Sequence, residues 1–357
     1  MTQAPATPVP IGWPWIIAVA ARRPPRRRRR RRGRVPELVV AIPTFRRAEA
    51  LRNALTAVRA QVDVENGLAD APMHCSILVI DNDSAGSGEQ IALEIGAKYV
   101  IEPQPGIAAV RNRALGECEH ARAVLFIDDD EIPEPGWLRA MIEMYTATKP
   151  TAVAGRVVTH IPEVVEPWVS KGGAFDRPIR TRGQLIREAA TNNLLLDLDG
   201  VHRLGLSFDE RFGLTGGSDS MFTLQLTRRG GTIRWAEDAV VIEQEDPRRF
   251  SPRWVLMRTF RFGNTSARVR IALARSRAGR LVERLRALGR GTVRAVGGSV
   301  RWGFGVVAGS VRHRAYGLRT ATRGLGMMAG ALGYAHDEYG RRRQRSSMKS
   351  TGRVNRP

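Results

Sequence analysis

The sequence predicts an α/β fold with a mainly parallel central sheet flanked by helices, followed by a basic helical extension. Two observations predict the sheet. Between residues 37 and 150, short runs rich in Val, Ile and Leu alternate with segments in which apolar residues recur every three or four positions, a pattern typical of strands alternating with helices. Three of these runs also end directly in polar, mostly charged clusters, at residues 44–47, 81–84 and 128–131. In a parallel sheet such strand ends share one edge, where ligands bind.

The first half of the chain contains the regular part of the pattern. Residues 38–43 predict a buried strand that ends at its proline, and the apolar spacing over 51–58 predicts the helix that follows. Ser87 and Gln90 have the spacing of a capping box, which predicts a helix beginning there. The other elements expected here are strands over 76–80, 98–101 and 123–127, a helix over 106–117, and a helix with Pro135 in its first turn.

The strand over 123–127 leads into four adjacent carboxylates, Asp128–Glu131, which Pro133 follows. Adjacent carboxylates repel one another, and a cation between them would relieve the repulsion. In an extended segment Asp128 and Asp130 point to the same side. The sequence therefore predicts that both can meet one divalent ion. A solvated acidic loop is the alternative interpretation of such a run.

The pattern after residue 150 is less regular. We expect a long excursion containing Pro and Gly over 162–190, and a helix that begins after Gly216 and Gly217. An amphipathic helix is expected over 252–263. The strands expected in this half are 151–158, 191–196, 232–235 and 239–242.

The net charge of +22 is concentrated at the two ends of the chain. Residues 1–36 are rich in Pro and Arg, contain no acid and are predicted to be disordered, as is the basic tail over 341–357. Residues 264–340 predict basic amphipathic helices that associate with an anionic membrane surface; a soluble helical appendage and a nucleic-acid-binding arm are the alternatives. Two cysteines are too few for a disulfide framework, which favours a reducing, cytoplasmic compartment.

Four segments, taken in order, resemble a known family: Val40–Arg47, Val79–Ser84, Gly106–Ala114 and Phe126–Glu131, the last with the DXD motif Asp128-Asp129-Asp130. They resemble the family 2 glycosyltransferases, most closely the bacterial succinoglycan-type (ExoM-like) glucosyltransferases. The resemblance implies a GT-A fold over residues 37–263, with a nucleotide-binding half (37–131) and an acceptor half (132–263). It also implies inverting transfer of a sugar from a nucleoside diphosphate donor.

The same resemblance implies roles for individual residues on the donor side. Asp130 would hold Mg²⁺ or Mn²⁺ on the diphosphate, and Asp128 would contact the ribose, bound water or the metal. Asp81 would contact the base, usually uracil, which suggests a UDP-sugar donor. The residues expected near the nucleotide in addition are Thr44, Arg46 and Glu49, and Arg111 could pair with a phosphate or be a charge on a helix surface.

On the acceptor side, an inverting displacement needs a base that takes the proton of the acceptor hydroxyl. The family carries a Glu-Asp pair after a glycine-rich turn; here Ser218 replaces the first acid and Asp219 is kept. Asp219 is therefore the predicted base, with Asp209 and Glu210 as weaker candidates, although a helix N-cap at Ser218 or Asp219 is the alternative. Asn192 or Asn193 resembles an acceptor-side Asn.

The expected acceptor is a saccharide or a lipid-linked saccharide in polysaccharide or glycolipid biosynthesis. The expected location is the cytoplasm, with peripheral association to the inner membrane, and no specific nucleic acid is expected as a partner. Two other functions remain open from the residues alone. One is a nucleic-acid-binding protein that uses the Arg-rich ends. The other is a metal-dependent nucleotidyltransferase, which also places carboxylates on an α/β sheet.

Overall fold

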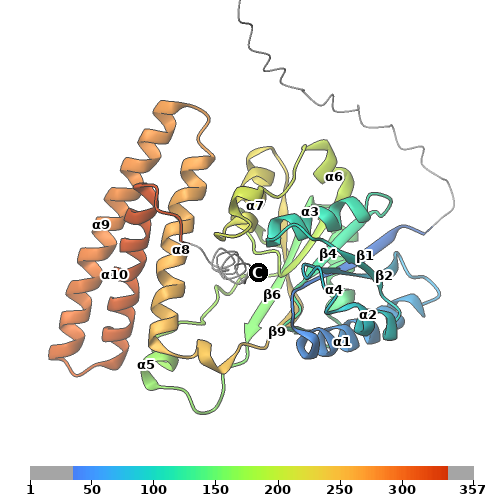
Figure 1. Cartoon of the computed structure of the whole chain (residues 1–357), viewed down its shortest axis with the longest axis horizontal. Coiled ribbons are helices and arrows are strands. Elements are labelled where there is room, and N and C mark those ends of the chain that lie inside the picture. The colour runs from blue at the N-terminus through green and yellow to red at the C-terminus, as the bar shows by residue number, and fades with distance from the viewer. Residues whose placement is uncertain (1–34, 337–357) are drawn as a thin grey trace, which may run out of the picture. The chain divides into compact units, whose positions relative to one another are not determined.

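The structure is a computed structural model that describes residues 35–336, which belong to one compact unit (Figure 1). Of the segments predicted to be disordered, 1–36 and 341–357, residues 1–34 and 341–357 lie outside the described part of the chain, and residues 35 and 36 directly precede the first strand. A nine-stranded sheet has the order β3-β2-β1-β4-β8-β6-β9-β5, with β7 paired to β9. Its strands are β1 (Glu37–Thr44), β2 (His74–Asp81), β3 (Lys98–Ile101), β4 (Ala123–Ile127), β5 (Glu131–Pro133), β6 (Ala152–Thr159), β7 (Leu185–Ile186), β8 (Asn193–Asp197) and β9 (Ile233–Glu243).

The pairing confirms a mainly parallel α/β sheet. Strands β1 to β4 pair in parallel, and β6 pairs with β9 in parallel. Because β8 is antiparallel to both β4 and β6, these two strands share one direction. The strands that oppose this direction are β5, β7 and β8. The carboxyl ends of β1, β2 and β4 consequently meet at one edge, as the sequence predicts.

Helices cover both faces of the sheet (Figure 1). Side chains of a strand alternate between the faces, so Leu125 belongs to the core under α1 and α4, and Phe126 belongs to the core under α3 and α7. All five residues of β4 are buried, which places the acidic run after β4 at the centre of the edge. The helices are α1 (Ala48–Asn66), α2 (Glu89–Glu94), α3 (Ile107–Glu117), α4 (Trp137–Thr148), α5 (Pro167–Ser170), α6 (Leu198–Arg203), α7 (Ser218–Arg228), α8 (Pro252–Ala272), α9 (Arg277–Val307) and α10 (Val311–Ala331), with short 3₁₀ turns η1 (Glu210–Phe212) and η2 (Pro247–Arg249).

Several local predictions are wrong for identifiable reasons. Ser87 forms no capping box: α2 has Gly88 as its N-cap with no side-chain cap, and the backbone N–H of Gly88 donates to the Asp81 carboxylate instead (2.8 Å). Pro43 does not end β1 but pairs with Ile80 inside the ladder. Pro135 lies before α4, whose N-cap is Gly136. The two strands expected over 232–242 are one strand, β9, whose ladder with β6 shifts register at Gly155 and Arg156.

The C-terminal extension is the helical segment that the sequence predicts. Helix α8 continues through residue 264 to Ala272, across the limit expected between the transferase domain and the extension. Helices α8, α9 and α10 pack through glycines: a Cβ added to Gly263 would lie 2.1 Å from the carbonyl oxygen of Arg323, and one added to Gly298 would lie 2.3 Å from the backbone nitrogen of Ala321. Within residues 35–336, no helix is both long enough and apolar enough to cross a bilayer.

Candidate active site

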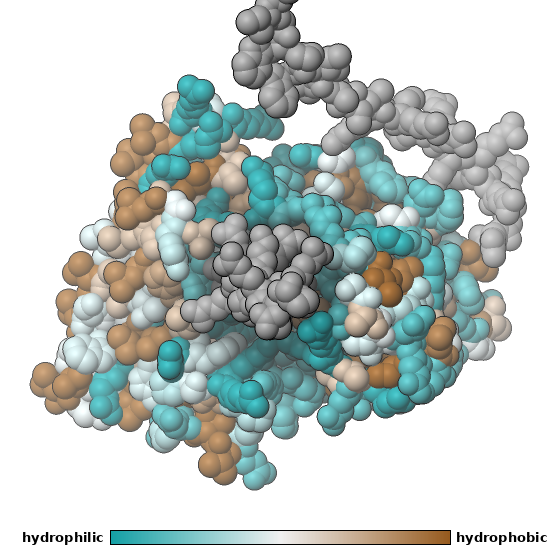
Figure 2. Space-filling model, viewed as in Figure 1, coloured by the Kyte–Doolittle hydropathy of each residue, from teal (hydrophilic) through white to brown (hydrophobic). Residues whose placement is uncertain are grey.

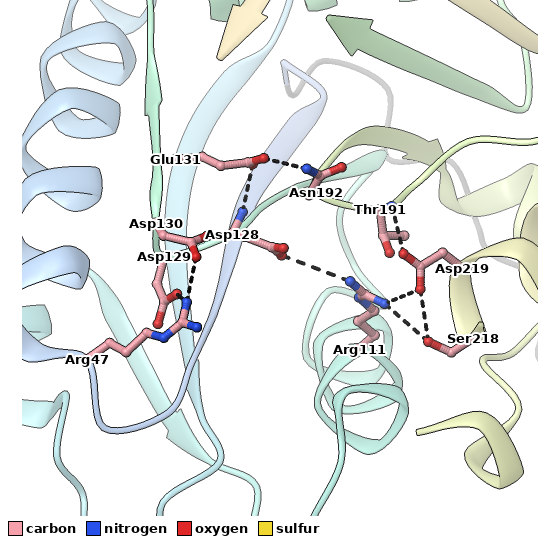
Figure 3. Close-up of polar contacts among 10 residues, drawn as sticks. All are labelled: Arg47, Arg111, Asp128, Asp129, Asp130, Glu131, Thr191, Asn192, Ser218 and Asp219. Atoms are coloured by element: carbon pink, nitrogen blue, oxygen red, sulfur yellow. Dashed lines mark hydrogen bonds and ion pairs between the residues drawn. The ribbon is translucent and has the colours of Figure 1, made fainter. Parts of the chain in front are cut away.

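The acidic run after β4 forms a tight turn. The backbone N–H of Glu131 donates to the carbonyl oxygen of Asp128 (3.2 Å), and Glu131 then pairs with Glu243 as the first residue of β5. The expectation of an extended segment is therefore wrong, because the chain reverses to join β9. Figure 3 shows the consequence: the carboxylate of Asp128 points toward Arg111, whereas that of Asp130 points toward Arg47.

Arg47 holds two of the four carboxylates. Its Nη1 donates to Asp129 Oδ1 (3.0 Å) and to Asp130 Oδ2 (2.7 Å). The other oxygen of Asp129 accepts from the hydroxyl of Thr44 (2.8 Å), so the carboxyl ends of β1 and β4 are joined through side chains. Arg47 was not among the predicted site residues. Its position beside the predicted nucleotide residue Arg46, at the end of a strand, is the sequence signal that could have identified it.

A second arginine links the acidic turn to the start of α7. Arg111, buried on α3, donates to Asp219 (2.8 Å) and lies 4.0 Å from Asp128. It also donates to the hydroxyl of Ser218 (3.2 Å), which in turn donates to Asp219 (3.1 Å). The helix-surface alternative for Arg111 is excluded by this burial. Arg111 therefore joins Asp128 and Asp219, two residues predicted to act at opposite ends of the reaction.

Two glycines with positive φ, Gly216 (73°) and Gly217 (99°), turn the chain into α7 and place Asp219 in its first turn. Gly217 is the N-cap and no side chain caps the helix, so neither Ser218 nor Asp219 serves the capping role that was the alternative. Burial acts to raise the pKa of Asp219, but the Arg111 guanidinium and the Ser218 hydroxyl together hold it below its ordinary value. Asp219 is accordingly ionised at neutral pH.

Asp128 has the opposite electrostatic balance. Burial, opposed by Arg111 and reinforced by Asp130 and Asp129, raises its pKa to about 7. A raised carboxyl pKa in the folded state means that the folded protein binds the proton more readily than the unfolded chain does. The contribution of Asp128 to stability therefore falls as the pH rises from its unfolded pKa of about 4 to about 7. The partial exposure of its side chain (35%) moderates this loss.

We expect D128N to raise the melting temperature of the metal-free protein at pH 8 by about 2–4 °C, and to leave it unchanged near pH 4, where the carboxyl of the parent protein is protonated. The reason is that asparagine never acquires the charge that the folded state disfavours. Thermal unfolding in EDTA at the two pH values measures the difference. D70N, at an exposed aspartate in a loop, is the matched control and should show no pH-dependent gain. Equal melting temperatures for D128N and the parent at pH 8 would contradict the raised pKa.

Glu131 was predicted only as part of the acidic run, and the structure gives it a separate place. It is buried, accepts from the backbone N–H of Asp128 (3.2 Å), and accepts from the side-chain amide of Asn192. Burial, with repulsion from Asp128 and Glu243, raises its pKa well above the ordinary value. Asn192 thus fixes the end of the acidic turn. Asn193 points elsewhere: it binds the indole N–H of Trp137 (2.9 Å) and backbone carbonyls in the core.

The residues predicted to contact the nucleotide surround the same sheet edge. Asp81 is fully buried, and its carboxylate accepts from the backbone N–H of Asp83 (2.8 Å) and Gly88 (2.8 Å) and from the hydroxyl of Tyr99 (3.0 Å). It therefore shapes the loop after β2. Arg46, which has a positive φ of 54°, forms an ion pair with Asp83 (2.9 Å). Glu49 is exposed in the first turn of α1.

A cavity of about 920 Å³ lies between the edge and the helical extension. Arg111, Asp128, Asn192 and Asp219 line it. Neither weaker base candidate does: Asp209 pairs with Arg211 (2.6 Å), and Glu210 accepts from Gln104 (2.7 Å). Helices α8 and α10 contribute the other wall, with Arg261, Phe262, Thr265, Ser266, Arg270 and Arg323.

The donor set of the acidic turn fits a hard divalent cation. Within residues 35–336, no group of three or more His, Cys, Asp or Glu side chains could hold a metal ion by itself. Mg²⁺ usually takes one or two carboxylates and completes its coordination with water and substrate phosphates. Asp130 could supply one of them, whereas the carboxylate of Asp128 points toward Arg111 (Figure 3) and would have to turn to supply a second. Burial, with the neighbouring charges of Asp130 and Asp129, raises the pKa of Asp128, and a bound cation would favour its ionised form.

Comparison with known proteins gives concordant findings. Residues 39–204 match the sequence profile of glycosyl transferase family 2. The succinoglycan biosynthesis protein ExoM of Rhizobium meliloti (strain 1021) is 29% identical over 237 residues, which cover 64% of this chain and 74% of ExoM. Among solved structures, S. aureus TarS is similar with a TM-score of 0.44 and 13% identity over 67% of this chain, which spans less than half (44%) of TarS. The mannosyltransferase PcManGT from Pyrobaculum calidifontis, in complex with GDP-Man and Mn²⁺, has a TM-score of 0.47 and 14% identity over 89% of this chain and 79% of its own.

Proposed function

Because the chain belongs to glycosyl transferase family 2, we propose that it transfers a hexose from a UDP-sugar, with inversion, to a saccharide or lipid-linked saccharide. The family and the ExoM relative support sugar transfer in polysaccharide biosynthesis and agree with the GT-A fold expected from the motifs. The inverting stereochemistry, the uridine base, the hexose and the acceptor are parts of the proposal.

One observation carries the proposal: Asp128, Arg111 and Asp219 form a continuous polar row inside a single cavity. Inverting transfer needs positive charge near the departing diphosphate and a base on the acceptor side of the sugar. The Arg111 guanidinium lies beside Asp128, where the donor is expected, and its other contact orients Asp219. Asp219 would take the proton of the acceptor hydroxyl as the new glycosidic bond forms, and Arg111 would keep that carboxylate in place.

The donor side would be formed by the strand-end residues. Thr44 and Asp81 order the loops after β1 and β2 around the expected nucleotide, and Arg46 and Glu49 lie on the same side of the sheet. Asp130, with Asp128 nearby, would hold Mg²⁺ or Mn²⁺. When bound, such an ion supplies positive charge to the diphosphate leaving group.

The proposal is tested by incubating the full chain with a panel of nucleotide sugars, Mg²⁺ or Mn²⁺, and short oligosaccharide acceptors. We expect UDP release that increases when acceptor is present, and NMR should show a product whose anomeric configuration is opposite to that of the donor. Retained configuration would contradict the inverting assignment. Pyrophosphate release from a sugar phosphate and a nucleoside triphosphate would identify a nucleotidyltransferase instead.

We further propose that the protein is cytoplasmic and binds the inner membrane peripherally through α9. This helix has an arrangement opposite to that of an ordinary surface helix: small residues face its partners, and large apolar residues face outward. Ala287, Gly291, Gly298 and Gly305 are buried, and a Cβ on Gly305 would lie 2.5 Å from the backbone nitrogen of Arg314. The exposed residues that recur at helical spacing on the other side are Leu281, Leu285, Val293, Val296, Val300, Phe304 and Val307. Figure 2 shows apolar residues along this side of the molecule.

The charges around that face favour an anionic lipid surface over a second copy of the chain. Residues 277–331 contain eleven arginines and one acid, Glu283, so two copies would repel each other through these helices. Arginine stems can lie along a bilayer interface while their guanidinium groups bind lipid phosphates. The apolar face, about 39 Å long from Leu281 to Val307 at 1.5 Å per residue, would lie parallel to the membrane plane.

We expect the full chain to float with vesicles of phosphatidylcholine and phosphatidylglycerol (7:3) and not with pure phosphatidylcholine vesicles. Replacing Val293, Val296 and Val300 together by serine should weaken binding about tenfold or more, because three apolar side chains no longer leave water. A matched triple serine variant at the exposed residues Val64, Leu93 and Val164, outside the extension, should bind like the parent. Equal losses in both variants would contradict a specific role of α9.

A further inference from the structure

The acidic turn already contains a cation, the guanidinium of Arg47. A single nitrogen, Nη1, donates to Asp129 (3.0 Å) and to Asp130 (2.7 Å), so one positive centre bridges two neighbouring carboxylates (Figure 3). Arginine–carboxylate pairs are frequently bidentate, with two parallel N–H donors on one carboxylate. The arrangement at Arg47 is instead that of a point charge placed between two anions, which is what a metal ion would supply.

The surroundings explain why a cation is needed there in the absence of a ligand. Asp129 is buried and Asp130 is 18% exposed, so water screens their repulsion poorly. Arg111 lies beside Asp128 and pairs with Asp219, on the other side of the turn from Arg47 (Figure 3). Without Arg47, the run Asp128–Glu131 would therefore hold two adjacent, uncompensated carboxylates.

Arg47 is also placed so that it can leave. Its side chain is 41% exposed, in contrast to 5% for Arg111. It is the residue before α1, in a short bend that follows β1, and its side chain makes no cap with the helix. Asp129 would keep one partner after the departure, because its second oxygen remains bound to Thr44. Asp130 would keep none of the contacts that the structure describes for its side chain, so it is the carboxylate released for a new cation.

We propose that Arg47 is an internal placeholder for the divalent cation: it neutralises Asp130 in the donor-free protein and is displaced when the metal arrives. This inference rests on the proposed metal role of Asp130. An internal competitor raises the apparent Kd of the site for the metal, which equals the intrinsic Kd divided by the fraction of molecules in which the carboxylate is free. The metal alone then binds weakly, and the charges of the nucleoside diphosphate make binding favourable. Arg47 thereby couples metal binding to donor binding and keeps the site from holding a metal without its substrate.

The test is the affinity for Mn²⁺ alone, measured from the EPR signal of free Mn²⁺ in titrations of the full chain without nucleotide. If Asp130 is free in about one-tenth of molecules, R47Q should lower the Kd for Mn²⁺ about tenfold. R47K keeps the charge and should stay near the parent value. R52Q is the matched control, because it removes the same charge from an exposed residue of α1 whose partner is Glu94 and which has no proposed role in the site; its Kd should change by less than about twofold, since water screens an exposed, separately paired charge.

Two outcomes overturn the placeholder role: an R47Q affinity equal to that of the parent, or an equal gain in R52Q, which would indicate a general charge effect. A melting curve tests whether R47Q is folded. If R47Q is not folded, R47K supplies the comparison, because a tenfold lower Kd for Mn²⁺ in R47K would also overturn the placeholder role. A repeat with UDP separates this inference from the proposed function. If Mn²⁺ does not bind the parent protein, either alone or with UDP, the metal role of Asp130 itself is overturned. If Mn²⁺ binds the parent protein with UDP but R47Q leaves the Kd for Mn²⁺ alone unchanged, only the role of Arg47 is overturned.

Discussion

D219N is expected to lower the rate of sugar transfer about 10²–10⁴-fold and to leave the binding of UDP unchanged. Asparagine has the shape of aspartate and can still contact Arg111 and Ser218, but it cannot accept the proton of the acceptor hydroxyl. Transfer is measured with saturating acceptor, and UDP binding is measured by calorimetry. Because the pKa of Asp219 is held below its ordinary value, the base stays ionised throughout the neutral range, so its titration should not limit activity between pH 6 and 8.

The matched control for D219N is D209N. Asp209 lies ahead of the same glycine-rich turn, but it caps η1 and pairs with Arg211, and it is not among the residues that line the cavity. D209N should retain transfer within about twofold of the parent, as expected for a residue outside the site. The assignment of Asp219 fails if D219N keeps more than one-tenth of the activity or if D209N loses as much.

D130A should abolish metal-dependent donor turnover, with a loss of about 10³-fold at a fixed Mn²⁺ concentration. The physical reason is that Asp130 is the proposed anchor for the cation that neutralises the diphosphate. The measurement is the rate of UDP release as a function of Mn²⁺, and a part of the loss should be recovered at high Mn²⁺ if Asp128 still contributes. D70A, which removes an exposed carboxylate in a loop, is the control and should leave the metal dependence unchanged. Normal activity in D130A would end the metal assignment.

D130A also differs from D219N in what it should preserve. D219N should keep metal binding, because the ion pair of Asp219 is with Arg111, which lies between Asp219 and Asp128. D130A should lose the EPR-detected binding of Mn²⁺ in the presence of UDP. Loss of Mn²⁺ binding in both D130A and D219N would indicate that Asp219 belongs to the donor side instead of the acceptor side.

The positions of the site residues at the sheet edge could be predicted because strand order and direction follow from local patterns. The apolar runs before Thr44, Asp81 and Asp128 are short, rich in branched residues and bounded by polar clusters, so they predict parallel strands with neighbouring ends. The family resemblance is also carried by these ends, and the profile match over 39–204 confirms it. The roles assigned to individual residues stay predictions.

The directions of side chains could not be predicted, because they depend on partners far away in the sequence. Asp128 and Asp130 diverge because β5 must reverse to reach β9, more than one hundred residues later. Ser87 and Gln90 have the spacing of a capping box, but the carboxylate of Asp81 accepts the backbone N–H of Gly88 at the start of α2. Arg47 was missed for the same reason, since its two carboxylates lie 82 and 83 positions along the chain.

The continuity of α8 has a consequence for exchanging parts between related enzymes. The helix begins at Pro252, in the part of the chain predicted to be the acceptor half, and runs without a break into the extension, and its residues on both sides of position 264 line the cavity. A chimera joined near residue 264 would divide one wall of the cavity between two parents, although the whole profile-matched region, 39–204, would come from one. Acceptor preference and the identity of the C-terminal helices should therefore be inherited together, and chimeras that preserve function should place their junction before Pro252.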